Sequence, residues 1–378
     1  MHENHYDIAI IGGGLAGLAL SIQSANDGYR TILFEKEHFP HQKVCGEYIS
    51  MESYGFLESL GIPLRDMHLP MIRKLMVSAP NGSSLEQPLP LGGFGISRFT
   101  LDAMLASLAR NKMVTVLEDT KAEDAHFTGD AFIIDAGNRR YTSSILVSSF
   151  GKRSNLDIKW KRPFTQSKPN KLNHYIGVKY HIKTDHPAEL IALHNFTNGY
   201  CGISQIEDGK CCLCYLTTAE NLKHHGNSIK KMEESLLSMN PFLKKIFTNA
   251  SFLFDSPVTI SQISFDKKEQ VSDHMLMVGD AAGMITPLCG NGMSMALLGS
   301  KIAYSCINDF LTNKVSREAM ENSYRREWQK QFSARLKTGR MIQSFFGNST
   351  KTNLLIAVLR HFPYLTRQLV RLTHGKPF

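Results

Sequence analysis

The chain has 378 residues, 42% of them hydrophobic, which is enough for two or three packed regions with a sizeable core and excludes an intrinsically disordered protein. It holds no apolar run of about 18 residues that could span a membrane, and Gly12 interrupts the first apolar segment too early for a signal peptide, so we expect a cytoplasmic protein. The net charge of +9 arises in residues 314–378, which hold 13 Lys and Arg against 3 Asp and Glu. A basic tail on a near-neutral body indicates a local surface contact, whereas a nucleic-acid-binding protein would be basic throughout.

The chain begins with a strand–turn–helix–strand unit. Residues 6–11 are a short apolar strand, residues 12–17 a glycine-rich turn, and apolar residues from Leu18 onward continue with helical character. A second strand covers residues 29–34. This order, within about thirty residues, is typical of a βαβ unit.

The remaining elements indicate two units that alternate along the chain. In order, we expect a loop with one helix (36–64), two strands around a turn (74–94), a helix (98–109), several strands (114–147), mostly strands with one helix near 228–238 (160–257), a strand (275–278), a long helix (292–311) and a basic helical end. The predicted fold class is α/β, or α+β overall, with a doubly wound Rossmann-type domain, an inserted β-sheet substrate lobe and a helical C-terminus. The predicted boundaries are 1–64, 98–158 and 258–312 for the nucleotide domain, 65–97 and 159–257 for the substrate lobe, and 313–378 for the C-terminal region.

The first glycine turn has the dinucleotide-binding pattern Gly12-x-Gly14-x-x-Gly17. Gly12 allows the tight turn, Gly14 lets the backbone approach a pyrophosphate, and Gly17 permits close packing of the helix on the strand. The N-terminus of the helix offers free N–H groups to the phosphates. Glu35 ends the second strand, where it can accept hydrogen bonds from the adenosine ribose. The predicted contacts of this half of the site also include Ala16 and Lys36.

A second motif identifies the dinucleotide as FAD. Residues 277–283 follow a strand, and Asp280 after Gly279 can bring a carboxylate to the ribityl or phosphate part of an extended dinucleotide. The helix that follows can present backbone N–H groups and its dipole to the pyrimidine edge of the flavin, where negative charge develops on reduction. The contacts predicted there are Gly290, Gly292 and Met293.

These motifs carry a resemblance to a known family. Residues 12–17, Arg98 with Leu101-Asp102, and residues 279–283 resemble the corresponding elements of the p-hydroxybenzoate hydroxylase-fold flavoproteins. Within that group, Lys-Val-Cys-Gly-Glu-Tyr-Ile-Ser at 43–50 is similar to a segment beside the flavin in the geranylgeranyl reductase branch. The resemblance implies that Arg98 contacts FAD and that Cys45 and Gly46 lie near the isoalloxazine.

Two departures from the family bear on the reaction. Aromatic hydroxylases usually have His at the position of Gly283, whereas members of the reductase branch and flavin halogenases have Gly there, as this chain does. The aromatic-rich segment typical of prenyl reductases is replaced by residues 199–204, which lack its Trp, Phe and Pro. A Trp-rich halogenase segment is also missing, since the chain has only Trp160 and Trp328. Halogenation is therefore disfavoured.

The family implies two chemistries, in both of which the flavin reacts and the protein orients the substrate, so no catalytic triad or metal is predicted. The missing aromatic segment slightly favours a monooxygenase that hydroxylates a hydrophobic phenolic or polyketide-like compound. The Cys45 segment favours the alternative, a reductase of carbon–carbon double bonds in prenyl chains. A third class, a flavoprotein that modifies nucleic acid, lacks the interleaved aromatic residues it would need.

The cysteines and the electron source leave further alternatives. Cys45, Pro287 and Cys289 are the candidates near the flavin, and two reduced thiols there are favoured over a redox-active pair. The Cys-Cys-Leu-Cys run at 211–214 is interpreted as a buried strand and not as a zinc site, because no second ligand cluster accompanies it. No second dinucleotide motif exists, so NAD(P)H binds transiently or a partner reductase delivers the electrons.

The basic tail, residues 351–376, has two interpretations. It can form helices that cap the substrate lobe with a basic face in water, or an amphipathic anchor on an anionic membrane surface. The second interpretation would make the protein peripheral on the membrane, and it suits a greasy substrate.

Overall fold

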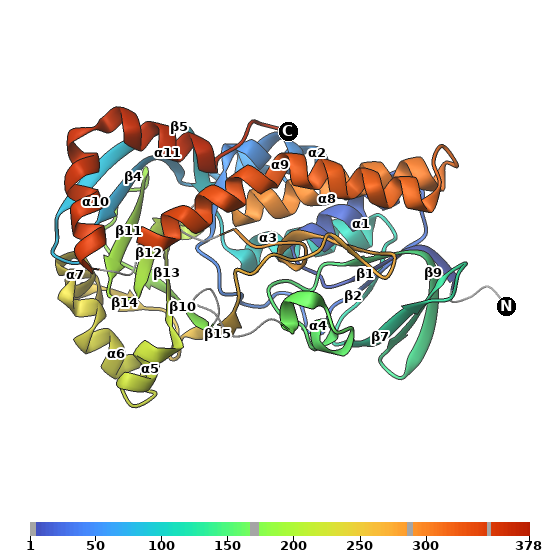
Figure 1. The fold of residues 1–378 in the computed structure, drawn as a ribbon, viewed down its shortest axis with the longest axis horizontal. Helices are drawn as coiled ribbons and strands as arrows, with labels where there is room; N and C mark the ends of the chain where they lie inside the picture. Colours follow the sequence, from blue (N-terminus) through green and yellow to red (C-terminus); the bar gives the residue numbers. More distant parts are fainter. Residues whose placement is uncertain (1–4, 167–173, 286–289, 346–348) are drawn as a thin grey trace.

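The computed structural model describes residues 5–166, 174–285, 290–345 and 349–378. Two β-sheets lie end to end, and helices run along them (Figure 1). The first sheet has eight strands: β1 (His5–Ile11), β2 (Thr31–Phe34), β6 (Thr115–Leu117), β7 (Ala122–Phe127), β8 (Phe132–Ala136), β9 (Arg139–Ser148), β16 (Val271–Ser272) and β17 (Met275–Met277). The second sheet has nine: β3 (Tyr48–Ser50), β4 (Met71–Ser78), β5 (Ser84–Gly95), β10 (Tyr175–Lys183), β11 (Leu190–Phe196), β12 (Gly199–Gln205), β13 (Cys211–Thr218), β14 (Ser251–Phe252) and β15 (Val258–Ile263).

The first sheet is a doubly wound nucleotide-binding sheet. Its order is β16-β17-β9-β1-β2-β6, and β17, β9, β1, β2 and β6 run parallel to one another. The helices of this half are α1 (Leu15–Asn26), α2 (Tyr54–Leu60), α3 (Arg98–Asn111), α4 (Asn155–Lys159) and α8 (Gly292–Leu311). In Figure 1, α1 and α8 lie on one side of the sheet, and α4 lies on the other. Because both faces are covered, β1 and β2 are almost continuously buried and apolar.

The second sheet buries one face against a small group of helices. These are α5 (Ala219–His224), α6 (Ile229–Ser235) and α7 (Pro241–Asn249). Alternate residues of β10, among them Val178 and Ile182, pack with Met232 and Leu243 from this group. The residues between them, including Lys179 and His181, therefore point to the opposite face, as the period of two in a strand requires.

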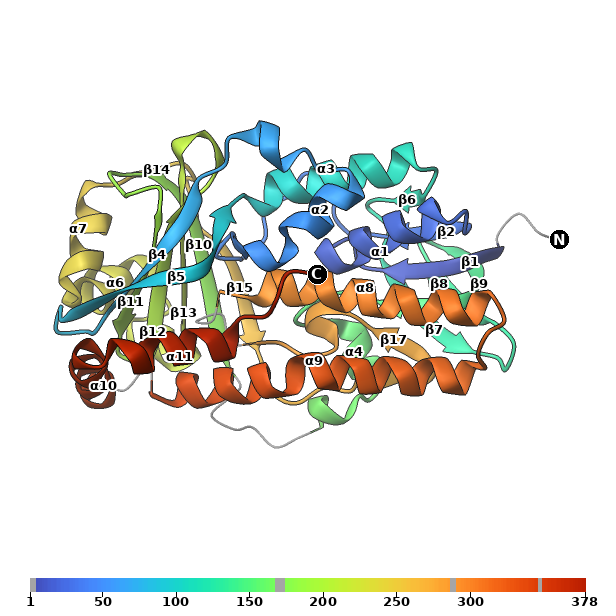
Figure 2. The same cartoon turned by 90° about the horizontal axis from the view of Figure 1, so that it is seen from above.

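The chain ends in three helices, α9 (Arg317–Phe345), α10 (Ser349–His361) and α11 (Pro363–Thr373). Seen from above, α9 runs beside α8, and α11 returns along it (Figure 2). Ile356 and Leu359 of α10 share a core with Val77 and Leu193 of the second sheet. The tail then reaches the nucleotide half, where the Gly375 N–H donates to the buried carboxylate of Glu52 at 2.7 Å. The C-terminal helices thus cap the second sheet, in agreement with the first interpretation of the basic tail.

The fold class predicted from the sequence is confirmed, with two corrections to the assignment of strands. The segment that starts at residue 258 was expected in the nucleotide domain, but β15 pairs with β10 in the second sheet. Likewise, β3 pairs with β5 of the second sheet, although it lies in the segment 1–64. Both are short edge strands whose partners are distant in sequence, so local pattern gives no sign of the sheet they join. Among the helices described here, none is long and apolar enough to cross a membrane.

Candidate functional site

The first glycine turn has the geometry that its spacing predicts. Gly12 has a φ of 104°, which favours glycine, and a Cβ at Gly17 would overlap the carbonyl oxygen of Gly12. Gly14 caps α1 without any side-chain hydrogen bond, and the first turn contains no acidic residue. The first N–H groups of α1 are therefore open to an anionic ligand.

Glu35 braces this turn from the end of β2. Its Oε2 accepts a hydrogen bond from the Gly13 N–H at 2.8 Å, and its Oε1 accepts one from the Glu37 N–H at 3.1 Å. The Lys43 ammonium lies 3.9 Å from Glu35 Oε2 and donates to the Gly13 carbonyl oxygen at 3.3 Å. The carboxylate predicted from the sequence thus lies against the glycine turn, and Lys43 is a neighbour that the sequence did not single out.

A charged cluster lies beside the turn at the start of α3. The Arg98 guanidinium donates twice to Asp102, at 2.7 Å to each oxygen, and Lys43 Nζ lies 3.0 Å from Asp102 Oδ2. Burial alone would raise the pKa of Asp102, but the charges of Arg98 and Lys43 outweigh it and lower that pKa. Asp102 therefore stays ionised and fixes two cations near Gly14, where they can face phosphate groups.

The second motif forms a short turn, Gly279–Ala281, which two buried cations hold from outside. Gly279 has a φ of 65°, and a Cβ built on it would lie 3.2 Å from Ala16 of α1. Lys268 Nζ donates to the Asp280 carbonyl oxygen at 3.0 Å, and Arg162 donates to the Ala281 carbonyl oxygen at 3.1 Å. Burial lowers the pKa of Lys268 to about 8.

The start of α8, where contacts with the flavin are predicted, resembles the start of α1. Asn291 caps α8 without a side-chain hydrogen bond to the helix, and the first turn contains no acidic residue. Gly290 has a φ of 62°. A Cβ at Gly283 would lie 2.8 Å from Trp328, so the histidine of aromatic hydroxylases has no room there. Pro287 and Cys289 lie outside the described residues.

A single cavity of about 1420 Å³ joins these elements. It is larger than most ligand sites, which hold about 300–1,000 Å³, and it can accommodate a dinucleotide together with a substrate. The predicted residues that line it are Gly12, Gly14, Ala16, Glu35, Lys36, Cys45, Gly46, Arg98, Gly279, Asp280, Gly290, Gly292 and Met293. Gly17 packs behind the turn instead, as its role in helix packing requires.

The cavity continues into an apolar chamber between the second sheet and the C-terminal helices. Its walls come from β4, β5, β11, β12, β13, β15, α10 and α11. The chamber-facing apolar residues include Leu75, Val77, Leu85, Leu89, Ile191, Leu193, Leu216, Ile260, Ile356, Leu359 and Leu369. The aliphatic lining suits a hydrocarbon chain.

A buried ionic cluster ties the loop 42–47 to the second sheet. Glu47 accepts hydrogen bonds from Lys179 Nζ at 2.5 Å and from the Arg98 N–H at 2.8 Å, and its other oxygen lies 2.6 Å from His181 Nε2. Burial would raise the pKa of Glu47, but the hydrogen bond to His181 and the charge of Lys179 lower it. Lys179 also donates to the Gln42 side chain and the Lys43 carbonyl oxygen. The cluster fixes the loop that carries Cys45.

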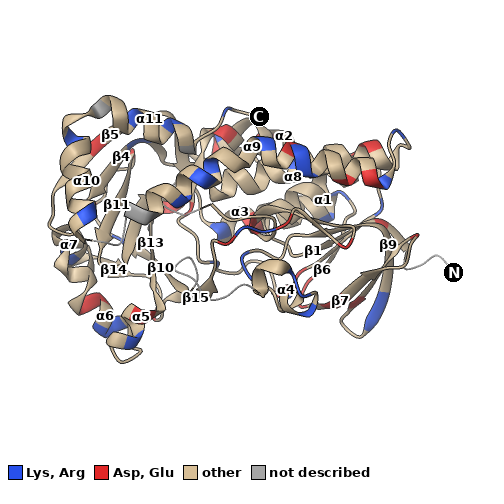
Figure 3. Cartoon of the chain, in the orientation of Figure 1, with Lys and Arg blue, Asp and Glu red and all other residues tan. Residues whose placement is uncertain are grey.

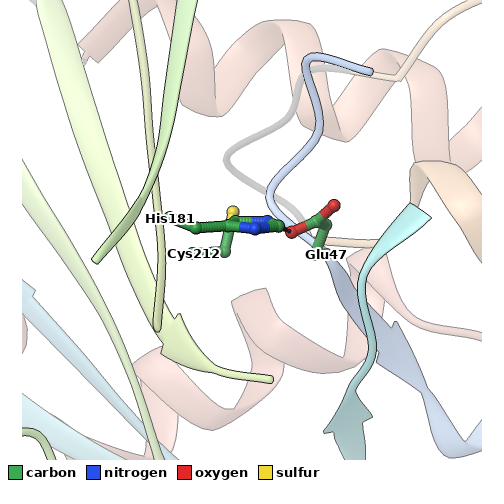
Figure 4. Close-up of side chains that lie close together, drawn as sticks. All are labelled: Glu47, His181 and Cys212. Carbon is green, nitrogen blue, oxygen red and sulfur yellow. Dashed lines mark hydrogen bonds and ion pairs between the residues drawn. The ribbon is translucent and has the colours of Figure 1, made fainter. Parts of the chain in front are cut away.

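This cluster could be taken for a metal site, because ligand atoms of Glu47, His181 and Cys212 lie within 4.8 Å of one another (Figure 4). Two observations argue against that. The Lys179 ammonium already neutralises Glu47, and burial raises the pKa of the Cys212 thiol well above its ordinary value, so it stays protonated. Cys212 instead donates to the Cys45 carbonyl oxygen at 3.2 Å. The structure also agrees with the buried-strand interpretation of residues 211–214, which belong to β13.

Sequence reasoning missed the residues that act through long-range contacts. Lys43 and Glu47 lie in the segment 43–50 that the resemblance placed beside the flavin, but their ionic contacts could not be predicted, because Lys179 meets Glu47 across 132 positions of sequence. Arg162 reaches the second motif in the same way, across 119 positions, whereas Lys268 lies only 12 positions before Asp280 and was missed because an isolated lysine gives no sign of its contact. Only a pairing of these segments in space brings them to the site.

Comparisons with known proteins agree with this geometry. A model of the FAD binding domain matches residues 7–42. Conditioned medium factor receptor 1 of Dictyostelium discoideum is 24% identical over 358 residues, which cover 87% of this chain and 68% of that protein. Digeranylgeranylglycerophospholipid reductase of Methanococcus vannielii is 24% identical over 353 residues, which cover 86% of this chain and 83% of that protein.

Two solved structures have the same fold. The flavin-dependent brominase Bmp2 aligns with a TM-score of 0.78 at 20% identity, covering 98% of this chain and 93% of that chain. A geranylgeranyl bacteriochlorophyll reductase-like protein from Thermoplasma acidophilum aligns with a TM-score of 0.78 at 16% identity, covering 99% and 97%. Together, these matches confirm the resemblance inferred from the sequence, FAD as the cofactor and the assignment of the chain as an FAD-dependent oxidoreductase.

Proposed function

We propose that this FAD-dependent oxidoreductase acts on a lipid-like substrate with a long hydrocarbon chain and reduces a carbon–carbon double bond in it. The observation that carries the proposal is the apolar chamber, which opens into the same cavity as the two glycine motifs. The digeranylgeranylglycerophospholipid reductase that aligns over most of its length acts, by its name, on such a lipid. Bound FAD would supply the hydride.

The residues of the chain would share the work of holding the cofactor. We assign the phosphates to the open N-terminus of α1 with Gly14 and Arg98, and the adenosine ribose to Glu35. Asp280 would contact the ribityl or phosphate part. Gly290, Gly292 and Met293 would contact the flavin ring from the start of α8, and Cys45 and Gly46 would contact it from the loop that Glu47 anchors. NAD(P)H or a partner reductase would supply electrons transiently.

A second candidate is oxygenation of a phenolic or polyketide-like compound. Gly202 of β12 faces the chamber within the segment that replaces the aromatic one of prenyl reductases. A Cβ there would find its nearest neighbour, Leu193, at 3.4 Å, an ordinary van der Waals distance, so glycine leaves the volume of a methyl group unfilled. Space at this position would favour a substrate with fused rings.

Reaction products distinguish the two candidates. Enzyme reduced by dithionite is mixed with a prenyl lipid without oxygen, and in parallel with alkylphenols under labelled oxygen. The proposal predicts anaerobic turnover and a product that gains two hydrogen atoms. Incorporation of labelled oxygen, without anaerobic turnover, would reject reduction and establish the second candidate. Cys45→Ser should slow the reductase and leave an oxygenase nearly unchanged, because the thiol belongs to the segment shared with the reductase branch and oxygenation does not require it.

The outer surface of the C-terminal helices favours a membrane as the source of the substrate. Lys and Arg occur along α9, α10 and α11 (Figure 3). The exposed apolar residues of α10 and α11 are Leu354, Val358, Phe362, Tyr364, Leu365 and Leu372. Exposed arginines at 360, 367 and 371 accompany them. We propose that the surface formed by these apolar residues and arginines of α10 and α11, without α9, contacts a bilayer of anionic lipid, which would make the protein peripheral on the membrane.

Co-sedimentation with vesicles tests the membrane contact. Changing Arg360, Arg367 and Arg371 to Gln should weaken binding to anionic vesicles by about 1 kcal/mol for each charge, and salt should weaken the wild type in the same way. The matched control changes three exposed cations of α9, Arg326, Lys330 and Lys337, to Gln. Equal binding by both variants would reject this surface as the contact.

A further inference from the structure

Two buried hydroxyl groups in the wall of the cavity have no hydrogen-bond partner. Several side-chain polar atoms among the described residues are buried and unpartnered, and of these only Tyr48 Oη and Ser204 Oγ belong to residues that line the cavity. Tyr48 is 5% exposed and Ser204 1% exposed. Leaving such a group unpaired costs about 1–3 kcal/mol, so two of them in one wall need an explanation.

Packing and strand pairing place the two residues in the same wall of the chamber. Tyr48 belongs to β3, directly after the loop that carries Cys45, and a Cβ at Gly290 would lie 3.1 Å from its ring. Its ring also packs in a small apolar cluster with Ile191. Ile191 pairs directly with Ser204 across β11 and β12, so both residues point to the chamber face.

The surroundings fix what these groups can bind. Burial, and then the negative charge of Glu52, raise the pKa of Tyr48, so its hydroxyl stays protonated and can donate a hydrogen bond. Ser204 can donate as well. A carbonyl oxygen has two lone pairs and can accept a hydrogen bond from each of the two hydroxyls. The side chains of the neighbours Ile72 and Leu89 are apolar and offer no hydrogen-bond acceptor.

We propose that Tyr48 and Ser204 form a subsite that donates hydrogen bonds to a carbonyl oxygen of the substrate. The substrate would then be a long-chain lipid that carries a carbonyl group at its flavin end, with the chain lying along the aliphatic wall. This inference rests on the proposed function, since it assumes that a hydrocarbon chain fills the chamber. It requires the substrate to carry a carbonyl group, which the apolar wall alone does not require.

Equilibrium binding to the FAD-loaded protein tests the subsite without turnover. The probes are a saturated long-chain methyl ketone, the alkane of equal length and a phenol with the same chain, followed by the change in flavin absorbance and by thermal shift. The ketone should bind about tenfold to a hundredfold more tightly than the alkane, as expected for two hydrogen bonds. Tyr48→Phe and Ser204→Ala should each remove part of this advantage and leave the alkane affinity unchanged.

The same variants carry their own control for folding. Because each hydroxyl is unpartnered, its removal should leave the melting temperature of the ligand-free holoenzyme unchanged or raise it, whereas a structural role would lower it. Tyr141→Phe removes a buried hydroxyl of the nucleotide half that does not line the cavity, and it should not alter the ketone advantage.

Other outcomes would overturn the inference. Equal affinity for ketone and alkane, or an advantage that survives both substitutions, rejects the subsite while the proposed lipid function stands. Loss of FAD from Tyr48→Phe would assign that hydroxyl to the cofactor. Tighter binding of the phenol, lost in both variants, would replace the carbonyl by a phenolic oxygen. Absence of binding by every chain-bearing probe would reject the proposed function and the subsite with it.

Discussion

Glu47 offers the sharpest test of how the site is held together. Glu47→Gln keeps the size of the side chain but removes the negative charge that faces the fully buried ammonium of Lys179 at 2.5 Å. Removing one partner of a buried ion pair costs about 3–5 kcal/mol, because the other charge is left without compensation. That is a large share of a total stability of about 5–15 kcal/mol. We therefore expect the free energy of unfolding of the holoenzyme to fall by this amount.

Urea denaturation followed by circular dichroism measures the change, and flavin fluorescence reports the release of FAD. In the double variant Glu47→Gln with Lys179→Met, part of the loss should be recovered, because the unpaired ammonium is gone. Asp135→Asn is the matched control. Its pair with Arg140 is exposed, 38% and 67% for the two side chains, so it should cost less than about 1 kcal/mol.

The pH dependence of this difference has a defined sign. The folded pKa of Glu47 lies below its ordinary value of 4.5, so its stabilisation is present above that pH and is lost as the pH falls through the folded pKa. The folded pKa of Lys179 lies above its ordinary value of 10.5, so its part is present below that pH and is lost at higher pH. The gap between wild type and Glu47→Gln should be widest between these limits. A gap below about 1 kcal/mol at neutral pH would refute the role of the cluster.

Three further predictions follow from the cofactor half. Gly17→Ala should destabilise the holoenzyme by about 1–3 kcal/mol through overpacking against Gly12, whereas Gly55→Ala, with nothing within 4 Å of the new methyl group, should be neutral or slightly stabilising; thermal melts compare the two. Glu35→Ala and Asp280→Ala should each weaken FAD retention by about 1.5–3 kcal/mol, measured by flavin release on dilution, and full occupancy in both would show that the cofactor is placed wrongly. The pKa of Lys268 is lowered from 10.5 to about 8, so its burial should penalise folding below pH 8 and less as the pH rises toward 10.5; that slope in unfolding free energy should vanish in Lys268→Met.

The elements that the sequence predicted well are those set by local pattern. The long helix expected at 292–311 has those bounds as α8, and the strands around the turn at 80–82 appear as β4 and β5. The glycine turn was predictable because a backbone constraint acts at each of its positions, as the overlap of a Cβ at Gly17 with Gly12 illustrates.

The parts that escaped prediction depend on which segments meet in space. Glu47 carries a φ of 56° and three hydrogen bonds to residues more than fifty positions away, none of which its neighbours in sequence reveal. Similarly, the apolar residues of α10 could be read as a lipid anchor or as a cap until their contacts with Val77 and Leu193 were known. Helical periodicity states that a face is apolar, and it does not state what covers that face.

Both loops on the flavin side of the site are held by buried cations that come from other parts of the chain. Lys179 of the second sheet holds the loop 42–47, and Arg162 and Lys268 hold the turn at 279–281. Each cation donates to backbone carbonyl oxygens. It therefore fixes the position of the loop backbone as well as that of the side chains it contacts. The loop 42–47 is therefore positioned by β10, a strand of the second sheet, whose other strands form the wall of the apolar chamber. Since the chamber wall and the loop share this anchor, charge pairing inside the protein sets the position of the loop relative to that wall.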